Sequence, residues 1–174
     1  MSDRRGVSCV SLRLRDWAAL IAVGCWLASG WTVLAQERGV TPPKDTIFAR
    51  KIMMGAIDTN MDAIETMLTP EGKLNLVDAQ EHADTISIML MAIPHMFPPS
   101  TNQWAPNVDR DPATDTSAAP DLWTNFADFY GRASEASKIA LEAARAKGPE
   151  DFRARIHDLR TACDSCHALY QKND

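Results

Sequence analysis

Apolar residues recur at helical spacing in four segments of the chain. In the first, residues 45–68, they repeat every seven positions in two rows that are offset by three. This pattern indicates a helix with one continuous buried stripe. Asp45 is predicted to cap its start, and Thr-Pro-Glu-Gly at residues 69–72 ends it. The two rows are Ile47, Met54, Met61 and Leu68, and Arg50, Ile57 and Ile64.

Three further segments have the same spacing. The second helix is predicted over about residues 75–93 and stops at Pro94, and the third starts at Pro120. The fourth follows the break at Lys147-Gly148-Pro149, and a proline-rich loop, residues 94–120, joins the second helix to the third. The three stripes are Leu76, Ala79, Ala83, Ile86, Leu90 and Ile93; Leu122, Phe126, Phe129, Ala133, Ala136, Ala140 and Ala143; and Phe152, Ile156, Leu159, Cys163, Cys166 and Tyr170.

No segment has the features of a β-strand. Val, Ile and Thr never alternate with polar residues over a strand length, and there is no Asn-Gly or Asp-Gly hairpin signal. Four amphipathic helices, two of whose connections are short, therefore predict an all-α fold, an antiparallel up-down-up-down four-helix bundle.

The fourth segment contains a Cys-x-x-Cys-His motif made by Cys163, Cys166 and His167. In c-type haem attachment, two thiols at this spacing each add to a vinyl group of the porphyrin, and the adjacent imidazole binds iron. On a helix the three side chains share one face, which is also the apolar stripe. A thioredoxin-like dithiol would accompany a βαβ pattern, and a structural zinc site would need a second pair of ligands. The sequence has neither, so the motif predicts one covalently bound haem c.

The N-terminal residues 1–35 have the features of a cleaved signal peptide. Arg residues precede an uncharged apolar run of 19 residues, and Val33 and Ala35 fit a cleavage site before Gln36. The alternative is an uncleaved membrane anchor, for which this run is just long enough. Cleavage would leave residues 36–174 as the mature domain, with Cys163 and Cys166 as its only cysteines. Haem of this type is attached outside the bacterial cytoplasm, so we expect a periplasmic protein.

The charge of the mature chain limits its partners. Residues 36–174 hold 14 basic and 21 acidic residues. A net negative charge argues against nucleic acid as a partner and favours electrostatic attraction to a basic redox partner protein.

Together, the helix order, the leader and the C-terminal motif resemble the cytochrome c′ family. Residues 49–64 (ARKIMMGAIDTNMDAI) resemble its first helix, and residues 120–129 (PDLWTNFADF) resemble the start of its third. The resemblance implies that Arg50 contacts a haem propionate and that Met54 occupies the distal position. In the family, Met at this position either binds the iron or only packs over it. The position four after the haem His is usually basic in the family, whereas here it is Gln171.

Two functions follow from these residues, and neither is enzymatic. If Met54 binds the iron, the haem is low-spin and the protein is an electron carrier. If Met54 only packs over the haem, the open position favours binding or buffering of nitric oxide or carbon monoxide. A peroxidase would need a polar acid–base pair over the iron, whereas the neighbours of Met54 include the apolar Ile57. Met61 is a weaker alternative ligand. The resemblance implies that a homodimer through the first two helices is possible, but exposed positions there, such as Lys51 and Asp58, are polar, so the oligomeric state stays open.

Overall fold

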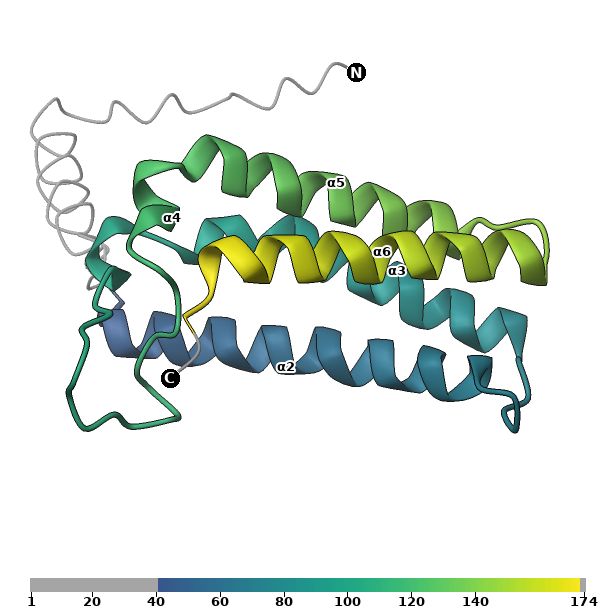
Figure 1. Ribbon diagram of the computed structural model, residues 1–174, viewed down its shortest axis with the longest axis horizontal. Coiled ribbons are helices and arrows are strands. Elements are labelled where there is room, and N and C mark those ends of the chain that lie inside the picture. The colour runs from purple at the N-terminus through teal and green to yellow at the C-terminus, as the bar shows by residue number, and fades with distance from the viewer. Residues whose placement is uncertain (1–40, 173–174) are drawn as a thin grey trace, which may run out of the picture. The chain divides into compact units, whose positions relative to one another are not determined.

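Four long helices run along a common axis in alternating directions in the computed structural model, which describes residues 41–172 (Figure 1). The predicted signal peptide lies outside the described residues. Within them, the only β pairing is an isolated antiparallel bridge between Ala118 and Gln171. The predicted antiparallel four-helix bundle is therefore confirmed. The long helices are α2 (Pro43–Leu68), α3 (Leu76–Ala92), α5 (Phe126–Ala144) and α6 (Pro149–Tyr170).

Helix α2 buries five of the seven residues in its predicted stripe, and the other two, Met54 and Leu68, are half-buried. The prediction that Asp45 caps the helix is wrong, because α2 begins at Pro43 and Pro42 is its N-cap residue. Proline suits a first helical position, since its missing N–H would have no partner there. Asp45 lies in the first turn, where its charge interacts favourably with the helix dipole. The buried residues of α2 are Ile47, Arg50, Ile57, Met61 and Ile64.

Helix α3 has a side-chain cap at its start and a proline near its end. The Asn75 side chain accepts a hydrogen bond from the backbone N–H of Asp78 at 3.5 Å. At the other end, the chain tightens into the 3-10 helix η1 (Ile93–Met96). Pro94 has no backbone N–H to continue the α-helical ladder, which explains why the helix stops close to the predicted position.

The third predicted helix is interrupted at Asn125. A short helix, α4 (Asp121–Thr124), precedes α5, and the Asn125 side chain donates to the Asp121 carbonyl at 3.0 Å. The interruption changes the helical phase. Phe126, a member of the predicted buried stripe, is therefore 36% exposed, whereas Leu122 and Phe129 are buried as expected.

The end of the long loop forms a strap, residues 115–119, that connects α2 with α6. On the α2 side, Lys51 Nζ donates to the Asp115 carbonyl at 3.0 Å. On the α6 side, the Ala119 N–H donates to the Tyr170 carbonyl and the Lys172 N–H donates to the Ser117 carbonyl, both at 2.8 Å. The first part of the loop contains a second 3-10 helix, η2 (Pro99–Thr101).

The helices do not pack equally closely around the bundle. Helix α3 packs against α2 and α5, and α5 packs against α6, whereas α2 and α6 approach each other much less. Small residues make the α3–α5 contact close, and Ser137 Oγ donates across it to the Ser87 carbonyl at 2.8 Å. The wide side of the bundle is thus the side that carries Cys163, Cys166 and His167. Within residues 41–172, no helix has the length and apolar character to cross a membrane.

Candidate functional site

The three motif residues lie within five residues near the end of α6, with Cys163 one turn before Cys166 and His167. Cys163 and Cys166 are half-buried free thiols that pack against the core, and His167 is exposed. Burial raises the pKa of the Cys163 thiol to about 11, and it raises the pKa of Cys166 as well. The raised pKa values favour the neutral form of both thiols before a haem is attached. The prediction that the motif lies on the inner side of the bundle holds for the two cysteines.

The motif borders a depression between α2 and α6. Two cavities of about 240 and 320 Å³ lie there. They share five lining residues and are therefore adjoining parts of one space, which we call the haem cavity. The shared residues are Met54, Phe129, Cys166, His167 and Gln171.

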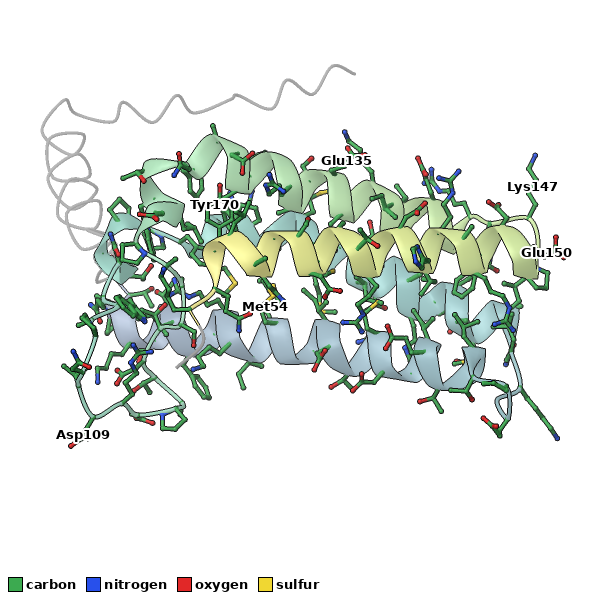
Figure 2. The ribbon with its side chains drawn as sticks, in the orientation of Figure 1. Met54, Asp109, Glu135, Lys147, Glu150 and Tyr170 are labelled. Carbon is green, nitrogen blue, oxygen red and sulfur yellow. The ribbon has the colours of Figure 1, made fainter. Side chains whose placement is uncertain are left out.

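Met54 reaches this space from the helix that faces the motif. Its side chain is half-buried and borders both parts of the cavity, between α2 and α6 (Figure 2). Met61, one heptad later, borders only the larger part and is 1% exposed in the core. Of the two methionines considered as ligands, Met54 is therefore the one that shares both parts of the space with His167.

Arg50 places a buried charge at one end of the haem cavity. It is 4% exposed and borders the smaller part. Its guanidinium donates to Thr101 Oγ1 at 2.9 Å and to Thr116 Oγ1, and it stacks on the Phe97 ring at 4.3 Å from the centroid. Burial lowers its pKa from the ordinary arginine value to about 10, so it stays protonated at neutral pH. No carboxylate among residues 41–172 forms an ion pair with Arg50.

Three residues that the sequence reasoning missed form a network beside the motif. Tyr170 Oη donates to Asp128 Oδ2 at 2.6 Å, and Arg132 Nε donates to the same oxygen at 2.7 Å. The bond from Arg132, and then the bond from Tyr170, lowers the pKa of Asp128. The spacing of Asp128 and Arg132 on one helix face is visible in the sequence. Their connection to Tyr170 is a tertiary contact that the sequence does not reveal.

This arrangement fits a haem with two thioether bonds. One wall of the cavity carries two thiols and an imidazole at the required spacing, and the facing wall carries a thioether sulfur. Phe129 and other apolar side chains line the space, as a porphyrin ring requires. The buried guanidinium of Arg50 has only hydroxyl and carbonyl acceptors, so it has capacity for an anion.

Comparison with known proteins identifies the family. The family model described as Cytochrome C' matches residues 45–171, which include every residue of the haem cavity. The chain belongs to the cytochrome c′ family. Members of this family carry a covalently attached c-type haem, so the predicted cofactor is confirmed.

Relatives and solved structures agree with this assignment. Cytochrome c-556 of Agrobacterium fabrum (strain C58 / ATCC 33970) is 26% identical over 163 residues, which cover 92% of this chain and 97% of the relative. Cytochrome c-556 of Agrobacterium tumefaciens (strain II Chrys) is 28% identical over 127 residues, which cover 70% and 93%. The structure of cytochrome c prime from Shewanella frigidimarina has a TM-score of 0.65 at 20% identity, over 78% of this chain and 100% of that one. It supports the fold.

Proposed function

We propose that this cytochrome c′ family protein is a periplasmic one-electron carrier. The observation that supports this best is the position of Met54 and His167, which border the same cavity from α2 and α6. A haem with imidazole and thioether ligands changes its charge by one electron with little change in its coordination.

In this proposal, Cys163 and Cys166 hold the haem through thioether bonds and His167 supplies the proximal nitrogen. The haem, when bound, supplies a reversible one-electron couple of its iron. Helix α6 brings the three side chains to one face, because residues at i, i+3 and i+4 are neighbours on a helix surface. The core contacts of the two cysteines restrict their rotamers and keep the sulfurs in place.

Arg50 is proposed to bind a haem propionate. Its guanidinium is buried and borders the cavity, yet its hydrogen-bond acceptors are neutral. A buried charge is costly unless an opposite charge compensates it. A propionate carboxylate would supply that charge, and the loop hydroxyls of Thr101 and Thr116 would hold the guanidinium in position to receive it.

The alternative function is binding or buffering of a diatomic gas. One structural neighbour, 15% identical with a TM-score of 0.64, is described as the nitric oxide complex of a mutant of cytochrome c prime from Alcaligenes xylosoxidans. In this chain the side chain that would compete with such a ligand is Met54. The gas-binding function would apply if Met54 packs over the haem without binding the iron.

The optical spectrum of the haem-loaded protein, oxidised and reduced, with and without carbon monoxide, distinguishes the two functions. We expect a six-coordinate low-spin spectrum that the gas leaves unchanged, and a high-spin, gas-responsive spectrum in Met54→Ala. Met53→Ala is the matched control, because Met53 packs against the core but does not border the haem cavity. A wild-type spectrum that is high-spin and shifts with the gas would refute the electron-carrier function and favour the alternative.

We also propose where the protein is located and which proteins it binds. The leader would direct the chain to the periplasm and be removed before Gln36, which N-terminal sequencing of the periplasmic protein tests. The acidic surface would favour a basic redox partner. Exposed apolar side chains on α2 and α3 would suit a homodimer. Those side chains are Phe48, Ile52, Val77, Ile88 and Met91.

We also propose that the protein is not an enzyme. Peroxidase chemistry needs an acid–base pair beside the iron. One turn before Met54 on α2 is Arg50, which is bound to the loop. One turn after Met54 are Ile57, which is buried, and Asp58, an exposed carboxylate at the border of the larger part of the cavity.

A further inference from the structure

Arg132 places a positive charge on the larger part of the haem cavity, from helix α5. It borders the larger part of the cavity together with Cys166 and His167. Its Nε is held by Asp128, as described above. Its two terminal nitrogens donate to no other group among residues 41–172. Within the described part of the chain, the guanidinium is thus fixed through Nε alone, and its two terminal nitrogens are available to another acceptor.

Asp128 connects this guanidinium to the haem-binding turn of α6. Tyr170 lies three residues after His167, is 8% exposed, and packs edge-on against Phe129 with ring centroids 5.7 Å apart. Tyr170 is fixed by its packing in the core, and its hydroxyl donates a hydrogen bond to Asp128. Asp128 in turn accepts the hydrogen bond from Arg132 Nε, which fixes the position of the guanidinium. The position of the Arg132 charge relative to His167 is therefore determined by buried packing, although Arg132 itself is partly exposed.

We propose that Arg132 raises the reduction potential of the haem, with Asp128 as the positioning residue that also offsets part of the charge. Oxidised haem carries one more positive charge than reduced haem, so a nearby cation disfavours oxidation. This inference rests on the proposed attachment of the haem to Cys166 and His167. It does not depend on whether the haem carries electrons or binds a gas.

Other charges border the same part of the cavity. Arg160 is paired with Glu65 at 2.7 Å across α6 and α2, and Asp58 lies on α2. Gln171, also on this border, is uncharged. Neither Arg160 nor Glu65 has a hydrogen bond to a buried residue of the haem-binding turn. The Asp128–Arg132 pair is distinguished by its bond to Tyr170.

The test is the midpoint potential of the haem-loaded protein, measured by spectroelectrochemistry at low and moderate salt. We expect Arg132→Gln to lower the potential and Asp128→Asn to raise it. Arg132→Lys, which keeps the charge, should stay near the wild type. The shifts should shrink as salt increases, because Arg132 and Asp128 side chains are 36% and 50% exposed and salt screens them.

The matched controls are Lys138→Gln and Glu135→Gln. This pair, 3.2 Å apart, also lies on α5 but does not border the haem cavity, and Glu135 is on the outer side of the bundle (Figure 2). Both controls should leave the potential near that of the wild type. The proposal requires Arg132→Gln and Asp128→Asn to shift the midpoint potential in opposite directions. A purely structural role of the pair would not produce opposite shifts.

The inference is wrong if Arg132→Gln and Asp128→Asn shift the potential in the same direction, or by no more than the controls do. If Arg132→Gln does not fold, the other two variants still test the inference. A lowered potential in Asp128→Asn, or a large shift of the potential in Arg132→Lys, contradicts it. A haemochrome assay precedes the titrations. If that assay finds no covalent haem, the proposed attachment to Cys166 and His167 is refuted. Failure of the attachment is thereby distinguished from failure of the inference about Arg132.

Discussion

Replacing Arg50 with methionine separates two roles that its side chain could have. The variant Arg50→Met keeps most of the apolar volume and removes the charge. If Arg50 only ties the loop to α2, its loss removes three hydrogen bonds, to Thr101, Thr116 and the Met96 carbonyl. If Arg50 binds a propionate, its loss also leaves a buried carboxylate without a partner. The two cases differ in their expected free energies of unfolding.

The loop-only role predicts a small effect. Hydrogen bonds to a charged donor contribute about 1.5–3 kcal/mol each when well formed, and the contact of 3.4 Å to Met96 is long. Burial of the charge acts in the opposite direction, because it lowers the Arg50 pKa to about 10. That shift corresponds to a cost of at most about 3 kcal/mol, which solvent screening reduces further. Both threonine hydroxyls keep another bond in the variant, to the Pro98 carbonyl and from the Ala118 N–H. The net change is then about 1–2 kcal/mol.

The propionate role predicts a larger loss. Breaking a buried ion pair by removing one partner typically costs about 3–5 kcal/mol. We therefore expect haem-loaded Arg50→Met to be less stable than the wild type by about that amount, measured by urea unfolding at pH 7. Arg153→Met is the control, because exposed Arg153 also makes one cross-helix bond, to the Leu68 carbonyl at 3.0 Å, but lies outside the cavity. A loss of only about 1 kcal/mol in Arg50→Met, no larger than in the control, would refute the propionate role.

Two further predictions test the bundle and the network beside the motif. Phe152→Ala should destabilise the protein by about 3–5 kcal/mol in urea unfolding, because Phe152 is 0% exposed and its loss leaves a cavity; a loss under about 1 kcal/mol would contradict this packing. Asp128 has a native pKa below its ordinary 3.8, so its contribution to stability is present above that pH and is lost as pH falls through the native pKa. The melting temperature of Asp128→Asn should therefore lie below that of the wild type at neutral pH and converge with it in acid, whereas a constant difference would show that ionisation is not the cause.

The sequence predicted those parts of the fold that follow from local patterns. The heptad spacing of α2 located its buried face, and Pro94 located the end of α3, because both depend on residues close together in the chain. The interruption at Asn125 was not predicted. The apolar spacing continues through it, and only the side-chain bond to the Asp121 carbonyl and the change in phase reveal that α4 and α5 are separate helices.

In the candidate site, too, only the features that depend on local spacing or on the family resemblance were predicted. Local spacing brought Cys163, Cys166 and His167 to one face, and the resemblance suggested Arg50 and Met54. The acceptors of the Arg50 guanidinium come from residues 51 and 66 positions away, and Tyr170 meets Asp128 across 42 positions. Such contacts depend on how the loop and helices pack, so no local pattern in the chain indicates them.

The distribution of side-chain size between the helices explains why the cavity lies between α2 and α6. The facing stripes of α3 and α5 are largely alanine and serine, so these helices approach closely. The inner stripe of α2 holds larger side chains, and its half-buried Met54 faces the space beside α6. With α2 and α6 apart, the strap holds them together at one end through Lys51 and Tyr170. The sizes of these side chains therefore place the open side of the bundle next to the two cysteines, where a covalently attached haem would complete the core.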